Sequence, residues 1–315
     1  MKSKIIAEWL FWIVLSVVIF STGMMVSVAA PVLVLLAPVP FMVLTCRQGP
    51  REASLGVFFG GVLVFMALGT VPSVMYLIMV GVLGVFFGAA AAGAKSGVDF
   101  VFMALTGSIM SKVALLVIFT KYAGVNPFMV TPEAAQSMVA AVAGVMSQSG
   151  ISASQEAIRA YAEQMIATVS LLMPAMLILF AAADTMVSYT AGRKIFSRLG
   201  EKKFPELPPF GTWRFPKDIF WALLAALIVD LAGKAMPEVG IFKLLSANLM
   251  EVLRAVFLVE GLALCWYFMT SKGLHRALKV FLTAFCVFFS PVSYILSMVG
   301  IFDIWYDLRS RLRRK

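Results

Sequence analysis

Long apolar runs recur along almost the whole chain, and they constrain its fold more than any other feature of the sequence. Most of these runs have about the 20 residues that an α-helix needs to cross the hydrocarbon core of a bilayer. Charged residues make up only 13% of the chain, against about 25% in an average soluble domain. Because an isolated segment in hydrocarbon must satisfy its own backbone polar groups, the sequence predicts an all-α, polytopic bundle of transmembrane helices.

Nine segments have the composition of membrane spans, and we expect eight or nine passes. The second of these segments is short and contains Pro31, Pro38 and Pro40, while Pro291 lies within the ninth. A broken or re-entrant pass is tolerated only where other protein covers its backbone. The predicted spans lie at about 9–28, 31–44, 54–68, 73–94, 100–122, 167–191, 219–235, 247–269 and 280–299.

Two longer connections interrupt the spans. The stretch that follows the fifth span is the one long region that is not hydrophobic, and Thr131-Pro132 and Ser152 with Gln155 are typical starts of amphipathic helices. The connection after the sixth span is basic and rich in proline and aromatic residues. The predicted organisation is 1–123, an N-terminal five-span bundle; 124–166, an outward amphipathic helical loop; 167–192, the sixth span; 193–217, a basic cytoplasmic connector; and 218–315, the C-terminal spans and basic tail.

The basic residues predict the orientation of the chain and its main partner. They lie in short connections and at the ends, and the positive-inside rule puts that side in the cytoplasm. If the spans alternate, the cytoplasmic side carries Lys2, Lys4, Arg47, Lys95 and the 193–217 connector, so the N-terminus is predicted to be cytoplasmic. Anionic headgroups of the lipid bilayer account for the net charge of +10. The basic runs lack a nucleic-acid-reading module, so no nucleic acid partner is expected.

The arginine-rich tail conflicts with this simple topology. Nine straight passes would place Arg309 and the residues after it outside, against the positive-inside rule. Either the tail is an exception to the rule, or 280–306 is not one straight pass. Pro291 lies near the middle of that segment, so a break there would return the tail to the cytoplasm.

Polar and ionisable side chains within the predicted spans are the candidate site, because they are costly in hydrocarbon. Three of them follow one another at three-residue steps on one helix face, and the Glu–Arg pair among them favours a local ion pair. Lys112 would avoid a stranded charge by pairing with Asp184 or Glu260. Such a polar core either handles a solute or protons, or pins the bundle. The candidates are Lys112, Asp184, Ser188, Asn248, Glu251, Arg254 and Glu260.

Pairs of small residues at four-residue spacing indicate close helix packing. Gly56 with Gly60, and Gly84 with Gly88, would let helix backbones approach each other in lipid. Packing within the bundle is the structural interpretation. A docking surface for another membrane protein is the functional one.

No sequence pattern predicts catalysis. The three cysteines are far apart and lack metal-type spacing. The chain contains no nucleophile elbow and no HExxH motif. The glycine-rich stretch at 88–96 follows a predicted span rather than a β-strand, so it is not a phosphate-binding loop. We therefore expect no enzyme activity, no metal and no cofactor.

Four short motifs resemble those of the YybS-like family of uncharacterised bacterial membrane proteins. They are LPPFGTWRFP at 207–216, Asn248, EGL at 260–262 and GIFDIWYDLR at 300–309. That family is grouped at a distance with the substrate-binding S components of energy-coupling factor transporters. The resemblance implies a helical bundle in the bacterial plasma membrane with a pocket for an unknown small-molecule ligand. It also implies a membrane scaffold subunit and cytoplasmic ATPases that act in trans.

The chain also departs from the S-component pattern. S components typically have fewer spans and an Ala-rich docking stripe in the first helix, whereas the first span here offers Gly23 and Ser27. No ligand-binding residue can be carried over. The leading hypothesis is an S-component-like protein that binds or translocates a small solute, with 124–166 as a lid. The alternative is a non-transporting scaffold that recruits partners through small-residue helix faces and basic segments.

Overall fold

The structure, a computed structural model, describes residues 2–26, 30–122, 155–200, 204–306 and 308–313, together with part of 136–144. Over these residues the chain is helical and contains no β-strand. Seven helices in the described part of the chain are long and apolar enough to cross a membrane, or eight if a sharply bent pair counts as one span. The predicted all-α polytopic bundle is therefore confirmed.

The chain folds into two compact units. Unit 1 comprises Met1–Pro127 and Phe180–Leu207, and unit 2 comprises Phe128–Leu179 and Pro208–Lys315. Helix α9 (Gln155–Leu199) contributes its first part to unit 2 and its last part to unit 1. It runs on through Pro174, so the amphipathic helix predicted after Ser152 continues directly into the sixth span. Most of the rest of the predicted 124–166 loop lies outside the described residues.

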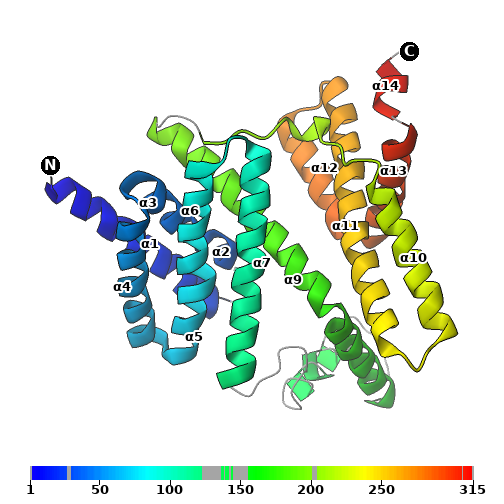
Figure 1. Ribbon diagram of the computed structural model, residues 1–315, viewed down its shortest axis with the longest axis horizontal. Helices are drawn as coiled ribbons and strands as arrows, with labels where there is room; N and C mark the ends of the chain where they lie inside the picture. Colours follow the sequence, from blue (N-terminus) through cyan, green and yellow to red (C-terminus); the bar gives the residue numbers. More distant parts are fainter. Residues whose placement is uncertain are drawn as a thin grey trace. The chain divides into compact units, whose positions relative to one another are not determined.

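Unit 1 packs its helices around a core of large aromatic side chains. Phe41, Tyr76, Phe87 and Phe100 in this core are completely buried. Gly49 and Gly69, both with positive φ, separate successive helices at the ends of α4. Besides α9, the helices of unit 1 are α1 (Lys2–Met25), α2 (Ala30–Leu36), α3 (Val39–Gln48), α4 (Pro50–Leu68), α5 (Thr70–Met75), the π-helix η1 (Tyr76–Val82), α6 (Leu83–Gly93) and α7 (Gly97–Tyr122) (Figure 1).

Unit 2 is built on the long helix α11 (Gly240–Ser271), which packs against α13 (Ser290–Tyr306). The two helices approach closely at glycines: a Cβ on Gly300 would lie 2.0 Å from the carbonyl oxygen of Phe257. The other elements are the 3₁₀-helix η2 (Phe210–Thr212), α10 (Ile219–Ala235), α12 (Arg276–Phe288) and α14 (Leu308–Arg313). Helix α10, predicted as the seventh span, has 17 residues, the short end of what crosses a bilayer.

The predicted ninth span is broken. Helices α12 and α13 meet at an angle of 100°, so 280–306 is not one straight pass. Pro291 is the second residue of α13, where its missing N–H leaves no helical hydrogen bond unmade. After α13, Arg309 bonds to the backbone of the connector at Gly211 and Trp213. The tail therefore begins beside the connector in unit 2.

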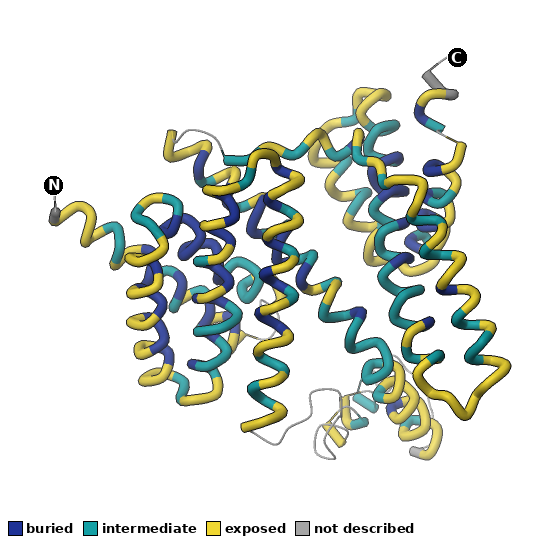
Figure 2. Tube along the Cα trace, in the orientation of Figure 1, coloured by how far each residue is buried: buried dark blue, intermediate teal, exposed yellow. Residues whose placement is uncertain are grey.

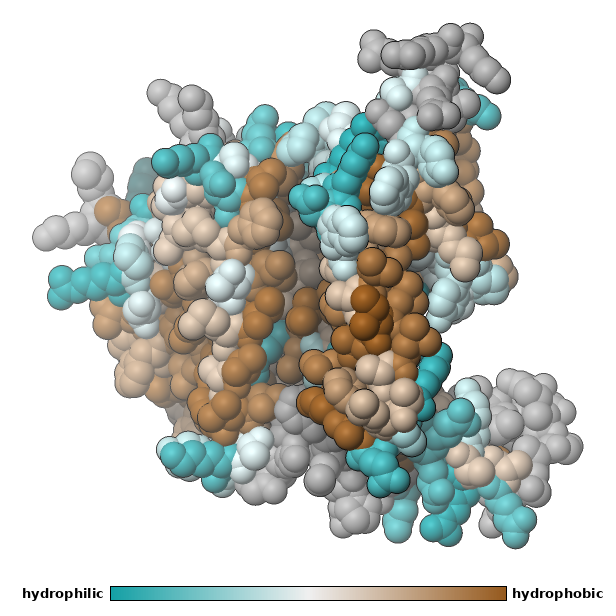
Figure 3. Space-filling model, turned by 45° about the vertical axis from the view of Figure 1, so that its right-hand side comes forward, coloured by the Kyte–Doolittle hydropathy of each residue, from teal (hydrophilic) through white to brown (hydrophobic). Residues whose placement is uncertain are grey.

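Both units expose large apolar side chains. Figure 2 shows exposed positions along the outer faces of the helices and buried ones between them. The exposed residues include Phe58, Phe102, Trp221 and Phe281. In Figure 3, brown side chains cover the middle of the helices and teal ones gather nearer their ends. This distribution suits helices that are surrounded by acyl chains.

Candidate functional site

Unit 1 contains a buried ion pair between α7 and α9. Lys112 Nζ forms a close ion pair with Asp184 Oδ2, and both residues are at most 6% exposed. Ser108, one turn before Lys112, accepts a hydrogen bond from Lys112 Nζ (2.9 Å) and donates one to Asp184 Oδ2 (2.9 Å). An unpaired charge in hydrocarbon is costly. The ion pair therefore allows both charged groups to lie between these helices.

This ion pair leaves one carboxylate oxygen unused. Both hydrogen bonds that Asp184 accepts go to Oδ2, and Oδ1 accepts none from the described residues. Ser188 lies one turn further along α9, on the same face. Its side chain is fully buried, and its Oγ has no hydrogen-bond partner in the described part of the chain. Two polar atoms about one turn apart thus form no hydrogen bond within the described residues.

Neighbouring hydroxyls on α9 behave differently from that of Ser188. Thr185 donates to the carbonyl of Ala181 (2.9 Å), and Thr190 donates to the carbonyl of Met186 (2.8 Å). Such bonds to the carbonyl four residues earlier are the common solution for a hydroxyl within a helix. A buried polar group without a partner costs about 1–3 kcal/mol. The lone hydroxyl of Ser188 is therefore the exception in this helix.

The π-helix η1 adjoins the ion pair. Ser111, next to Lys112 in the sequence, donates to the carbonyl of Ile78 in η1 (3.0 Å). At the start of η1, Tyr76 donates through its hydroxyl to Ser16 Oγ (3.2 Å). The wider turns of a π-helix frequently occur at functional sites. Ser108 and Ser111 are not among the residues predicted from the sequence. Ser108 lies four residues before a lysine within a span, and this spacing is the pattern that could have identified it.

Unit 2 contains a second buried ion pair. Glu260 on α11 is 1% exposed, and its Oε1 accepts a hydrogen bond from Arg309 Nη2 (2.9 Å). Its other oxygen, Oε2, accepts one from the backbone N–H of Phe215 in the connector (2.9 Å). Both carboxylate oxygens of Glu260 are therefore bonded within unit 2.

Arg309 completes this cluster from the C-terminal side. Its Nη1 donates to the carbonyls of Gly211 (2.9 Å) and Trp213 (2.8 Å). Its Nε lies 3.1 Å from Asp303 Oδ2. The guanidinium thus ties the connector, α11 and α13 together. Arg309 was predicted only as part of a basic tail, because its partner Glu260 lies 49 residues away in the sequence.

Asn248 connects α11 to α9 at the proline. Its Oδ1 accepts from the backbone N–H of Ala175 (2.7 Å), and its Nδ2 donates to the carbonyl of Leu171 (2.7 Å). In a regular helix these two backbone groups would bond to each other. Pro174, which has no N–H, lies between them in the sequence. The amide of Asn248 therefore inserts into the backbone ladder of α9, one of the known causes of a helix bend.

The remaining candidates are involved in packing. Glu251 and Arg254 form a close i,i+3 ion pair, and Arg254 also lies over the ring of Tyr294 (5.0 Å to the ring centre). The four predicted packing glycines all face other helices of unit 1. Their nearest neighbours are Ile13 for Gly56, Tyr76 for Gly60, Pro38 and Phe41 for Gly84, and Met42 and Thr45 for Gly88.

The structure distributes the predicted site residues among separate places. Lys112, Asp184 and Ser188 lie together in unit 1, whereas Asn248, Glu251, Arg254 and Glu260 belong to unit 2. Of the two partners predicted for Lys112, the structure pairs it with Asp184. No group of three or more His, Cys, Asp or Glu side chains in the described ranges is arranged to hold a metal ion.

Apolar helices with buried charges between them define a polytopic α-helical membrane protein. Residues 14–304 match the family described as predicted membrane protein DUF2232, and the chain belongs to that family. No curated protein and no solved structure matches it. The family match supports a location in a lipid bilayer, while the resemblance to the YybS-like family and to S components stays a hypothesis.

Proposed function

We propose that the protein binds a small polar solute within unit 1, as an S-component-like membrane protein. The observation that carries the proposal lies on one face of α9. Ser188 Oγ is buried and has no partner in the described residues, and Asp184 Oδ1, one turn away, accepts no hydrogen bond from them. A buried hydroxyl that served only to hold α9 in place would be expected to form a hydrogen bond, because an unpartnered buried hydroxyl costs stability.

The chemistry of these atoms defines the class of solute. A carboxylate oxygen only accepts hydrogen bonds, and a serine hydroxyl both donates and accepts. Lys112 already balances the charge of Asp184. The site therefore suits a neutral or cationic solute that presents an N–H or O–H donor. Hydrogen bonds at such a buried site are stronger than in water, because few competing water molecules are present.

Translocation is a further step of the same proposal. The resemblance to S components implies that a membrane scaffold subunit and cytoplasmic ATPases would energise it in trans. In this scheme the present chain recognises the solute, and its partners move it across the bacterial plasma membrane.

Thermal stabilisation tests the binding proposal. The detergent-purified protein would be heated with a panel of small amines, polyols and amino acids. We expect a stabilising compound whose effect is lost in Ser188→Ala and Asp184→Asn. Thr190→Ala is the matched control, because that hydroxyl is exposed and bonded within its own helix. Stabilisation that persists in both site variants would refute the proposed site.

A scaffold role is the second candidate function, and unit 2 favours it. Glu260, Arg309 and Asn248 are engaged in bonds within unit 2 itself, which suits a rigid support rather than a binding site. Removal of 311–315 would delete basic residues but keep Arg309. Under the scaffold hypothesis this truncation releases a co-purifying partner, and no compound of the panel stabilises the wild type. Under the solute-binding hypothesis, solute stabilisation survives the truncation.

A further inference from the structure

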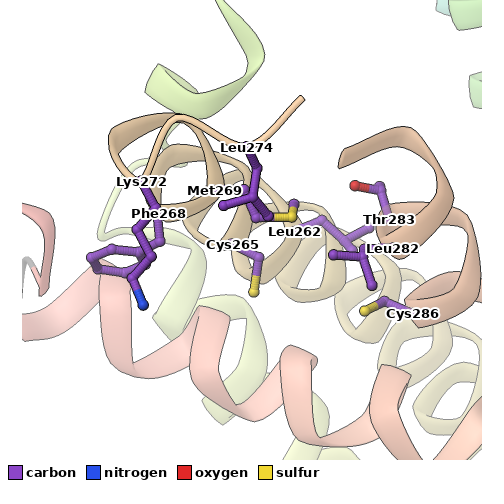
Figure 4. A pocket seen from close by; sticks show the side chains of 9 residues that line it. All are labelled: Leu262, Cys265, Phe268, Met269, Lys272, Leu274, Leu282, Thr283 and Cys286. Carbon is purple, nitrogen blue, oxygen red and sulfur yellow. The ribbon is translucent and has the colours of Figure 1, made fainter. Parts of the chain in front are cut away.

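A cavity of about 380 Å³ lies between α11 and α12 in unit 2. Figure 4 shows its lining side chains, with Cys265 and Met269 on α11 facing Leu282 and Cys286 on α12. Thr283 also lines it, but its hydroxyl donates to the carbonyl of Lys279 in its own helix (2.7 Å). The cavity therefore presents an almost entirely apolar wall of carbon and sulfur atoms.

Helix α12 packs loosely beside this cavity. None of its 13 residues is buried, and at 1.5 Å per residue it is only about 20 Å long. It is thus too short to cross the bilayer alone, and it turns sharply into α13. Because the cavity is partly open and its exposed neighbours on α12 are apolar, acyl chains can reach it from the side.

Positive charge surrounds one end of the cavity. Lys272 lines it, and Arg276 is the first residue of α12. Lys279 lies over the ring of Trp266 (5.3 Å to the ring centre), and its Nζ donates to Thr270 Oγ1 (3.2 Å). No Asp or Glu occurs between residues 261 and 302 in the sequence. This end of unit 2 therefore complements an anionic group, and Trp and Lys are typical of the level of the lipid headgroups.

We propose that this cavity is a binding site for an anionic phospholipid. One acyl chain occupies the apolar space between Cys265 and Cys286, and the phosphate lies at Lys272. The basic end gives preference for an anionic over a zwitterionic headgroup, because a lysine near the membrane surface attracts anionic lipid. The bound lipid fills the space that the short helix α12 leaves beside α11.

Photolabelling tests the proposal with the full-length protein. The protein would be reconstituted into phosphatidylcholine vesicles that contain a small fraction of phosphatidylglycerol with a photoreactive acyl chain. We expect the label on peptides from α11 and α12 to fall about fivefold in Lys272→Ala, the factor that one basic residue contributes near an anionic surface. Lys217→Ala, a change of another exposed lysine, leaves the label unchanged.

A second pair of variants tests the cavity itself. Cys286→Phe fills the space and should displace the label, whereas Ala284→Phe adds the same ring at an exposed position of α12 outside the cavity lining and should not. Gel filtration and melting temperature would verify that each variant is folded. The proposal is overturned if a phosphatidylcholine probe labels the wild type as strongly as the phosphatidylglycerol probe, or if Lys272→Ala leaves the label unchanged.

Discussion

The two units each bury an ion pair in a membrane-spanning helix, but they use the bonding capacity of the charges differently. In unit 2, both oxygens of Glu260 are bonded, and Arg309 reaches two carboxylates and two backbone carbonyls. In unit 1, Asp184 uses one oxygen, and Ser188 beside it uses none of its capacity among the described residues. The unit 2 cluster is a structural lock, because its charges bond to one another and to the backbone, although Arg309 Nε and Asp303 Oδ2 meet only as an ion pair without a hydrogen bond. In unit 1, the unused oxygen of Asp184 and the unpartnered hydroxyl of Ser188 mark a candidate site.

The largest expected effect comes from breaking the lock in unit 2. Arg309→Met would leave Glu260 and Asp303 buried without their cation and two backbone carbonyls without a donor. Removal of one partner of a buried ion pair costs about 3–5 kcal/mol, so we expect a large fall in melting temperature and in the folded yield. Arg276→Met, at an exposed position, is the control. A melting temperature for Arg309→Met equal to that of the control would contradict the lock.

Breaking the pair in unit 1 should cost somewhat less. Asp184→Leu leaves Lys112 with Ser108 as its remaining partner, and we expect a loss of about 3 kcal/mol. The double variant Lys112→Met/Asp184→Leu should recover much of this loss, because it removes both charges together. Melting temperatures of the two single variants and the double variant form the thermodynamic cycle. If the double variant loses the sum of the two single losses, the residues are not coupled.

Removal of the Asn248 amide, which bonds to the backbone of α9 beside Pro174, should lower the stability moderately. Asn248→Leu removes the partner of the Ala175 N–H and the Leu171 carbonyl, and we expect a loss of about 1–3 kcal/mol. Gln164→Leu, an exposed polar-to-apolar change on α9, should change the melting temperature little. Equal effects of the two variants would show that the hydrogen bonds of Asn248 to α9 do not stabilise the fold.

The smallest effect on stability is expected for Ser188→Ala, and this variant best distinguishes a candidate site in unit 1 from a structural cluster like that of unit 2. Ser188→Ala removes a buried hydroxyl that has no partner in the described residues. Without solute, we expect the free energy of unfolding to stay the same or to rise by up to about 1 kcal/mol. The melting temperature should therefore stay the same or rise slightly. Thr185→Ala, which removes a bonded buried hydroxyl, should instead destabilise slightly. A large loss of stability in Ser188→Ala would mean that the hydroxyl is a structural group rather than a ligand contact.

Ion pairs between residues three or four positions apart were predictable from the sequence. For ion pairs between distant residues, the sequence did not specify the partner. Glu251 with Arg254 and Asp230 with Lys234 are three or four residues apart, and both pairs form. Helical geometry alone brings such residues together. Lys112 and Asp184 are 72 residues apart, and the sequence left Lys112 with two possible partners. Spacing along one chain does not specify which helices become neighbours.

The apolar runs by themselves determined that the chain is a helical membrane bundle, because hydrocarbon leaves the backbone no other partners. They also located most of the spans, and Pro291 indicated where the last one breaks. Only the tertiary structure decided that Arg309 pairs with Glu260 and that Asn248 bonds to the backbone of α9 beside Pro174. It also decided that Ser188 has no hydrogen-bond partner among the described residues. These features depend on the rotation and register of packed helices, which arise from side-chain contacts between segments far apart in the sequence.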